Sequence, residues 1–320
     1  MKLILSTEWA AELKTQLPTD IQSVWVDDEG DFTGDPKGAE AFLSWFYVKS
    51  DTLHKVLATP TLRWQHMPSA GVNNILTPAF LDRNIVLTNG AGVFAEPIAE
   101  FVFAFMLNHA KQLPKLQAIQ AEHCWGQDFY CRQNGGPKDL EEATLLIIGA
   151  GGIGQAIAQR ASAFGMRVWG CRRNPQPLSE FDRMVGPQGW RSLLPEAEYV
   201  VLAAPLTSET RGMIDAAALR SMRSDAYLIN IARGALVDQA ALLTALQEDW
   251  IAGAGLDALW TEPLPPESPF WSLPNVFVTP HCSGFSPKNN QRSIALFLDN
   301  LNRYRSGMPL RNVVDQIAGY

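Results

Sequence analysis

The sequence predicts an α/β protein with two parallel-sheet domains, one of which is inserted in the sequence of the other. Three observations support this fold class. Short apolar runs alternate with helical patterns along most of the chain, as in parallel sheets covered by helices. A glycine-rich turn, Gly149-x-Gly151-x-x-Gly154, joins an apolar run to a helical pattern near the middle of the chain. The length of 320 residues suits about two domains.

Composition and charge exclude several classes of protein. The formal net charge is −7, whereas nucleic-acid-binding proteins usually present a basic face, so we do not expect nucleic acid as a partner. The first residues carry only three consecutive apolar side chains, too few for the core of a signal peptide, and no apolar run reaches membrane-spanning length. We therefore expect a cytoplasmic protein without a membrane partner. The cysteines include no C-x-x-C pair, so we expect neither a metal site nor a redox motif; they are Cys124, Cys131, Cys171 and Cys282.

The first part of the chain alternates between expected strands and helices. Strands are predicted at the apolar runs 3–6, 24–26, 42–46, 62–65 and 85–88. Helical patterns lie between them at 9–17, 51–58 and 71–81. Thr59-Pro60 should end the second of these helices, because proline cannot continue a helix. The polar, turn-rich segment 27–40 is predicted to be a loop.

Residues 96–121 form the longest helical pattern. Pro97 suits the first turn of a helix, and Pro114 should kink or break it. Residues 101–107 leave almost no polar face, so the helix needs cover on every side. Burial between two domains, a dimer interface and an ordinary place in the core would each provide that cover. We expect a homodimer through the 96–121 region.

The rest of the chain repeats the alternation. After a turn-rich connection at 124–139, strands are predicted at 145–148, 167–170, 199–205, 226–232, 254–259 and 276–280. The segment 289–304 reads as one amphipathic helix, between Ser286-Pro287 and Gly307. These elements predict one domain at 96–286 and another composed of 1–95 and 287–320.

The glycine-rich turn lies where a strand leads into a helix, which is the context that a dinucleotide-binding turn needs. Gly149 allows the tight turn, Gly151 lets the backbone approach a pyrophosphate, and Gly154 lets the helix pack close to the strand. The helix N-terminus offers unpaired N–H groups to the phosphates. We therefore predict cofactor binding by Gly149, Gly151, Gly152, Ile153 and Gly154.

The chain resembles the D-isomer-specific 2-hydroxyacid dehydrogenases in stretches spread along almost its whole length. They are 69–72, 87–89 with 95–96, 149–154 with 163–166, 231–238, 255–257 with 262–264, and 279–281 with Gly284. Several stretches in the order of the family are far more specific than any one of them. The resemblance implies a Rossmann dinucleotide-binding domain inserted into a flavodoxin-like substrate domain, both doubly wound. The NADPH-linked glyoxylate/hydroxypyruvate reductase branch is the most similar.

Three residues at predicted strand ends carry the chemistry that the resemblance implies. Arg233 follows a strand at the carboxyl edge of the sheet, where ligands bind in open α/β folds, and its planar fork suits a carboxylate. His281 follows another strand, and an imidazolium can protonate a developing alkoxide near neutral pH. Glu262 is the implied partner of His281, since a carboxylate would fix the tautomer and favour the charged ring. Without the resemblance, each would more often be an ordinary loop residue.

The resemblance also implies residues that bind the two ligands. The backbone of Ala70, Gly71 and Val72 would hold the substrate together with Arg233, because small residues permit close approach. Further contacts with the cofactor are implied at Pro205, Thr210, Ala232, Asp257, His281 and Gly284.

Arg172 and Arg173 indicate which nicotinamide cofactor is used. In an NAD-preferring domain, a carboxylate about 20 residues beyond the glycines binds the ribose hydroxyls. Here the second strand ends in Cys171-Arg172-Arg173, without a carboxylate. Two guanidinium groups would bind a 2′-phosphate. We therefore predict NADP(H) in preference to NAD(H), with both arginines in contact with the cofactor.

Together these features predict an oxidoreductase that reduces a small 2-oxo acid, such as glyoxylate or hydroxypyruvate, to the D-2-hydroxy acid with NADPH. The alternative is a nucleotide-binding sensor or corepressor-type module of the same fold with weak catalysis. The presence of Arg233, Glu262 and His281 favours the enzyme. Binding of NADPH without its oxidation by a panel of 2-oxo acids would favour the sensor.

Overall fold

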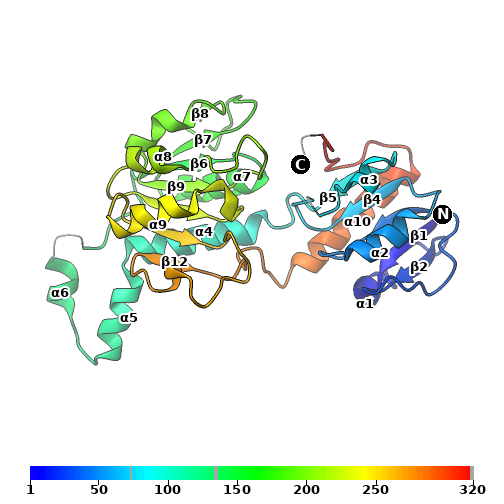
Figure 1. Ribbon diagram of the computed structural model, residues 1–320, viewed down its shortest axis with the longest axis horizontal. Coiled ribbons are helices and arrows are strands. Elements are labelled where there is room, and N and C mark those ends of the chain that lie inside the picture. The colour runs from blue at the N-terminus through cyan, green and yellow to red at the C-terminus, as the bar shows by residue number, and fades with distance from the viewer. Residues whose placement is uncertain (73, 133–135, 318–320) are drawn as a thin grey trace. The chain divides into compact units, whose positions relative to one another are not determined.

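The computed structural model describes residues 1–72, 74–132 and 136–317. The chain divides into two compact units, Met1–Phe94 with Ser286–Tyr320, and Ala95–Phe285 (Figure 1). The second unit is therefore contained within the sequence of the first. Among the residues that the structure describes, no helix combines the length and the apolar character needed to cross a membrane.

A five-stranded parallel sheet forms the centre of the first unit. Its strands lie in the order β2-β1-β3-β4-β5, so the winding reverses direction at β1 and β3. This is the doubly wound, flavodoxin-like order that the sequence predicted. The strands are β1 (Lys2–Ser6), β2 (Gln22–Val26), β3 (Ala39–Leu43), β4 (Trp64–Met67) and β5 (Val86–Asn89).

Helices cover both faces of this sheet because its side chains alternate between the faces. Ile4 and Phe42 pack toward one face, which is covered by α2 (Ser50–Leu57) and α3 (Pro78–Leu81). Leu3 and Trp64 pack toward the other face, which is covered by η1 (Thr7–Trp9), α1 (Ala10–Leu13) and α10 (Asn289–Arg305). The α10 helix therefore returns the end of the chain to the first unit (Figure 1).

Several predicted elements of this unit are displaced or shorter than expected. The strand predicted at 42–46 ends at Leu43, because Trp45 packs edge-on against Trp9 with ring centroids 4.5 Å apart. The helix predicted over 9–17 ends at Leu13, whose carbonyl accepts two N–H groups and closes a turn. The helix predicted over 71–81 comprises only α3, which begins after Thr77 caps it by accepting the Phe80 N–H. Position 73 of that prediction lies outside the described residues.

A seven-stranded parallel sheet forms the centre of the second unit. Its order is β12-β11-β10-β9-β6-β7-β8, so the winding reverses beside β6, between β7 and β9. This is the Rossmann order with one further strand, and it confirms the predicted fold class. The strands are β6 (Thr144–Ile148), β7 (Arg167–Cys171), β8 (Arg183–Val185), β9 (Tyr199–Leu202), β10 (Tyr227–Asn230), β11 (Gly253–Leu256) and β12 (Val276–Val278). The sequence prediction missed β8, whose three residues are too few for a periodic pattern.

The helix predicted to need cover on every side is a core helix of this unit. It forms α4 (Ala95–Ala110), which packs against α7 (Gly152–Ala163) and β10. The α4 helix packs closely on β11 at Gly255. A Cβ at that position would overlap the ring of Phe105, so the close contact requires glycine. The opposite face of the sheet is covered by η2 (Trp190–Glu196), α8 (Ala216–Ser221) and α9 (Gln239–Gln247). Two short helices, η3 (Gly234–Leu236) and η4 (Pro269–Trp271), lie in loops that follow strands.

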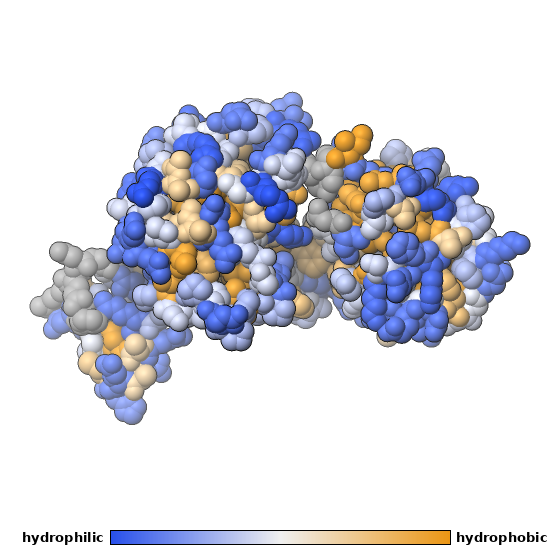
Figure 2. Space-filling view, viewed as in Figure 1, coloured by the Kyte–Doolittle hydropathy of each residue, from blue (hydrophilic) through white to orange (hydrophobic). Residues whose placement is uncertain are grey.

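The chain between 111 and 132 extends away from the seven-stranded sheet (Figure 1). As predicted from Pro114, the long helix breaks, and Gln112 at the break has a positive φ of 49°. The following helices are α5 (Leu113–Ala121) and α6 (Gln127–Arg132); the prediction of a turn-rich connection over 124–139 missed α6, and 133–135 lie outside the described residues. The α5 helix buries none of its residues, and apolar side chains lie at its surface (Figure 2). We call residues 113–132 the arm.

Candidate active site

Three adjacent strands of the second unit end in the residues that were predicted to be catalytic. The strands β10, β11 and β12 are neighbours and parallel, so their carboxyl ends lie at the same edge of the sheet. Arg233 follows β10, Glu262 follows β11 and His281 follows β12. In open α/β sheets this edge is where ligands bind.

His281 and Glu262 form a hydrogen-bonded pair. Nδ1 of His281 lies 2.8 Å from Oε2 and 3.0 Å from Oε1 of the Glu262 carboxylate. The Leu259 N–H donates to Oε1 at 2.9 Å and so holds the carboxylate in place. A carboxylate accepts only, so Nδ1 carries its proton toward Glu262, and Nε2 is the nitrogen that can exchange a proton with another molecule. The imidazole is 42% exposed, which gives such a molecule access.

Asp257 holds the backbone on both sides of His281. Its carboxylate accepts hydrogen bonds from the Thr279 hydroxyl at 2.7 Å, the Cys282 N–H at 2.8 Å and the Ser283 N–H at 3.0 Å. Asp257 is fully buried, so these bonds form in an environment of low dielectric constant. His281 itself has φ 52°, a left-handed conformation that a non-glycine residue keeps only when its surroundings enforce it. Sequence reasoning missed Thr279, and it assigned Asp257 only to the cofactor.

The turn that carries Arg233 packs against the backbone that leads to Glu262. A Cβ at Gly234 would overlap the backbone of Leu259, so this close approach requires glycine. Leu259 is also the residue whose N–H holds the Glu262 carboxylate. The half-buried guanidinium of Arg233 donates to the Ala232 carbonyl at 2.7 Å. The fold therefore brings the arginine turn beside the loop of the His281–Glu262 pair.

The predicted glycine turn leads from β6 into α7, and the space next to Gly151 and Gly152 is open. Gly149 has φ 110° and lies directly against the backbone of Ala203, which only glycine permits. A Cβ at Gly154 would overlap the Gly149 carbonyl oxygen, so the helix packs tightly on the turn. By contrast, a Cβ at Gly151 would meet open space, and among the residues that the structure describes no side chain caps the helix there. The unpaired N–H groups at the start of α7 can therefore receive a phosphate.

The other predicted cofactor residues of this unit lie around the glycine turn and the neighbouring strand ends. The Cys171 carbonyl accepts the N–H groups of Gly149 and Ala150 at 3.0 and 2.9 Å, so Arg172 directly follows the residue that holds the turn. Arg172 is half-buried and Arg173 is exposed. Beyond β9, the Thr210 hydroxyl donates to the Pro205 carbonyl at 2.8 Å and closes a loop. Ala232, Asp257, His281 and Gly284 follow β10, β11 and β12.

The predicted substrate loop lies in the first unit, directly after β4. The Asn89 side chain donates to the Ala70 carbonyl at 2.9 Å, and the Ser69 hydroxyl donates to the Gly71 carbonyl at 2.8 Å. Within residues 1–72, 74–132 and 136–317, the N–H groups of Ala70, Gly71 and Val72 make no hydrogen bond to the protein. Three successive backbone donors are thus available to an anionic ligand.

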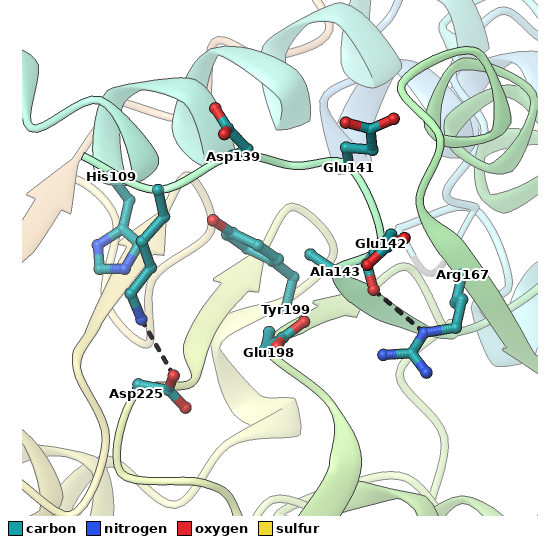
Figure 3. A pocket seen from close by; sticks show the side chains of 10 residues that line it. His109, Asp139, Glu141, Glu142, Ala143, Arg167, Glu198, Tyr199 and Asp225 are labelled. Atoms are coloured by element: carbon teal, nitrogen blue, oxygen red, sulfur yellow. Dashed lines mark hydrogen bonds and ion pairs between the residues drawn. The ribbon is translucent and has the colours of Figure 1, made fainter.

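A cavity of about 250 Å³ lies at the opposite, amino edge of the seven-stranded sheet (Figure 3). Its charges are largely paired within the protein: Lys138 contacts Asp225 at 3.0 Å, and Arg223 holds the pKa of Asp225 well below its usual range. Burial lowers the pKa of His109 to about 4, and its ring stacks on Tyr227. These are contacts of a structural ion-pair network. The lining residues are His109, Lys138, Asp139, Glu141, Glu142, Ala143, Arg167, Glu198, Tyr199 and Asp225.

The order of the seven strands and the glycine turn at their switch point define a Rossmann-fold protein of the dinucleotide-binding class. Within that class, the chain belongs to the D-isomer specific 2-hydroxyacid dehydrogenases. Residues 103–283, more than half of its length, match the model of the NAD binding domain of this family. The protein is therefore an oxidoreductase, and the resemblance seen in the sequence is confirmed.

Curated relatives and solved structures agree with this family. The chain is 36% identical over 264 residues to a glyoxylate reductase of Korarchaeum cryptofilum, with 81% of this chain and 78% of that protein covered. It is 34% identical to a glyoxylate/hydroxypyruvate reductase B of Citrobacter koseri, with 85% and 83% covered. A D-isomer specific 2-hydroxyacid dehydrogenase of Xanthobacter autotrophicus, solved with NADPH and MES, superposes with a TM-score of 0.87 at 28% identity, covering 100% of this chain and 99% of that one. An NADPH-dependent glyoxylate/hydroxypyruvate reductase of Sinorhizobium meliloti, solved with NADP and sulfate, gives 0.85 at 27% identity, with 100% and 99% covered.

Proposed function

We propose that the protein reduces small 2-oxo acids, such as glyoxylate or hydroxypyruvate, to D-2-hydroxy acids with NADPH. The observation that carries this proposal is the His281–Glu262 pair, bonded at 2.8 Å at the same sheet edge as Arg233 and the glycine turn. Reduction of a 2-oxo acid needs a proton donor beside the carbonyl oxygen and a cation for the carboxylate. The names of the curated relatives point to the same substrates.

Each of the three side chains has a part that its chemistry suits. Arg233 binds the substrate carboxylate through its planar fork and orients the adjacent carbonyl. His281 donates the proton from Nε2 to the carbonyl oxygen as that oxygen gains charge, and it takes the proton back in the oxidation direction. Glu262 keeps the ring oriented and stabilises its charge while the proton is on it. A nicotinamide dinucleotide with its phosphates at the glycine turn would supply the hydride.

The loop Ala70–Val72 supplies further contacts to the substrate carboxylate. Its three N–H groups are available as donors, and its residues are small enough to allow close approach. A carboxylate accepts several hydrogen bonds at once, so a row of backbone donors suits it. Asp257 holds the His281 loop through three hydrogen bonds, and Pro205, Thr210, Ala232 and Gly284 would contact the cofactor.

The test of this function is a spectrophotometric assay of NADPH oxidation with a panel of 2-oxo acids. The panel holds glyoxylate, hydroxypyruvate, pyruvate and acids with branched or aromatic side chains. We expect turnover with the smallest acids and formation of the D-enantiomer from hydroxypyruvate. Tight binding of NADPH without oxidation by any member would contradict the proposal and indicate a nucleotide sensor.

We infer that NADP(H) is preferred over NAD(H) because of Arg172 and Arg173. Arg172 follows Cys171, whose carbonyl accepts two N–H groups of the glycine turn, so its backbone lies next to the proposed phosphate site. Two guanidinium groups favour a 2′-phosphate, whereas a carboxylate would repel it. The NADPH and NADP complexes of the two structural neighbours support this preference.

Substitution of Arg172 by aspartate should move the preference toward NADH. The carboxylate would repel the 2′-phosphate and accept hydrogen bonds from the ribose hydroxyls instead. The measurement is kcat/KM for both cofactors in the wild type and in Arg172→Asp. Arg191→Asp, in η2, provides a control for the change of charge. A wild-type preference for NADH would overturn the inference, and so would an unchanged ratio in Arg172→Asp.

We infer a homodimer through the 96–121 region. The arm carries exposed apolar surface that a second copy of the chain would cover. The apolar side chains of Leu113, Leu116 and Trp125 are exposed on it, with Trp125 88% exposed. Apolar surface of this kind is usually covered by another protein surface, and homodimers with two-fold symmetry are the commonest assemblies.

We also place the protein in the cytoplasm, in keeping with its four free cysteines.

Light scattering after size exclusion should give twice the mass of the chain. Replacing Leu116 and Trp125 together by serine should shift the protein toward the monomer, because the apolar contact is lost. A double substitution of exposed residues in the first unit, Tyr47→Ser with Met308→Ser, serves as the control. A monomeric mass of the wild type at micromolar concentration would refute the dimer.

A further inference from the structure

We propose that Asn230 is a positioning residue for Arg233. Asn230 is the last residue of β10, three positions before Arg233, and it is only 1% exposed. The proposal rests on the proposed function, because it concerns how the arginine is presented to the carboxylate of a 2-oxo acid. Asn230 is too deeply buried to be expected to touch a substrate, so its effect must pass through the backbone that it holds.

The carboxamide of Asn230 holds the arginine turn at two points. Its Oδ1 accepts the Ala232 N–H at 3.1 Å, and its Nδ2 donates to the Arg233 carbonyl at 2.9 Å. The chain leaves the sheet at this point, where strand pairing no longer supplies partners for these backbone groups. Both bonds fix the direction of the backbone at Ala232 and Arg233, and therefore the point from which the guanidinium extends.

The same residue also connects the arginine turn to the loop of His281. The Asn230 carbonyl accepts the N–H groups of Asp257 at 3.0 Å and Ala258 at 3.3 Å. Asp257 in turn accepts three hydrogen bonds from the segment 279–283. A continuous, buried chain of hydrogen bonds thus runs from the Arg233 turn to the His281 loop. It would keep the Arg233 turn, which binds the substrate carboxylate, at a fixed distance from His281, which donates the proton.

Only a carboxamide of this length offers one acceptor and one donor in these two directions. An ionised carboxylate is isosteric but has no donor, so one of its oxygens would face the Arg233 carbonyl. A buried polar group that loses its partner is destabilising, and the turn would rearrange to avoid the repulsion. The Asn230→Asp substitution therefore disturbs the turn while it keeps the volume of the side chain.

Asn300 in α10 provides a matched control in the first unit. It is fully buried, its Oδ1 accepts the Arg311 N–H at 2.8 Å, and its Nδ2 donates to the Arg311 carbonyl at 3.1 Å. Asn300→Asp thus removes the same kind of donor from the same kind of pair of backbone hydrogen bonds, in the other unit. A second variant, Asn230→Ser, keeps a hydroxyl that can accept the Ala232 N–H and loses the bond to Arg233. If Asn230→Asp does not fold, Asn230→Ser is the variant that tests the inference.

The experiment measures KM and kcat for glyoxylate, the dissociation constant for NADPH, and hydrogen exchange of the peptide 231–234 in the full chain. In Asn230→Asp we expect KM for glyoxylate to rise about tenfold or more, with a smaller change in kcat and in NADPH affinity. Exchange at 231–234 should become faster, and Asn230→Ser should show a smaller effect of the same kind. Asn300→Asp should leave both KM and this exchange unchanged.

An unchanged KM in Asn230→Asp and Asn230→Ser would overturn the inference, and so would an equal rise of KM in Asn300→Asp. If the wild type reduces no 2-oxo acid, the proposed function fails by that result alone. Hydrogen exchange then decides whether Asn230 holds the arginine turn: unchanged exchange at 231–234 in both variants would show that it does not.

Discussion

Replacement of His281 by alanine should lower kcat by about 100- to 10,000-fold, the range typical for loss of a general acid. The proton for the carbonyl oxygen would then have to come from water, which is less acidic and not oriented. Nδ1 of His281 is bonded to Glu262 at 2.8 Å, so the intact ring presents Nε2 outward in a fixed direction. NADPH affinity should change far less than kcat, because the glycine turn proposed to bind the phosphates follows β6, whereas His281 follows β12 and is only one of the predicted cofactor contacts.

Stopped-flow measurement of NADPH oxidation at saturating glyoxylate gives the chemical step, and fluorescence titration gives NADPH affinity. The control is His54→Ala, which removes an exposed histidine from α2 in the first unit. Glu262→Gln should show a smaller loss of kcat, because the amide still occupies the position but no longer stabilises the imidazolium. Equal turnover in His281→Ala and the wild type would exclude His281 as the proton donor.

Replacement of Arg233 by lysine should raise KM for the oxo acid about ten- to a hundredfold. Hydrogen bonds to charged groups contribute about 1.5–3 kcal/mol, and lysine keeps the charge but loses the planar fork that binds both carboxylate oxygens. A fall in kcat is expected as well if the same guanidinium reaches the carbonyl oxygen. Gly234 beside it packs on Leu259, so the backbone should stay in place after the substitution.

Steady-state kinetics with glyoxylate, together with NADPH titration, separates the two effects. Arg167→Lys is the matched control, since Arg167 lies at the amino edge of the same sheet, beside the cavity of Figure 3. A variant with unchanged KM and kcat would exclude Arg233 from the binding of substrate.

Local patterns predicted the fold well wherever a strand was long enough to show one. The order of strand, glycine turn and helix at 145–163 needed no tertiary information, because each glycine has a local conformational reason. Short or irregular elements were not predictable in this way. The strand β8 has three residues, and α6 lies in a segment whose composition favours turns. Trp45 and Phe46 suited a strand by their apolar character, but they pack on Trp9 instead.

For the candidate site too, part could be predicted from local sequence and part depends on tertiary structure. The sequence alone indicated Arg233, Glu262 and His281 as separate residues after apolar strands, and the resemblance assigned their roles. The contacts between them depend on tertiary structure, because Glu262 and His281 are 19 positions apart and meet only when β11 and β12 pair. No local pattern specifies which strands become neighbours.

The sequence by itself determined the fold class, the family and the residue types available for chemistry. Periodicity, glycine spacing and strand ends are properties of short segments, so they can be recognised from the order of residues alone. Only the tertiary structure decided how these residues are held. Asp257 is buried beneath the His281 loop, Leu259 fixes Glu262, and the arginine turn packs closely on Leu259 because residue 234 is glycine. These supports join segments that come together only when strands distant in sequence lie side by side, which is why composition and spacing could not reveal them.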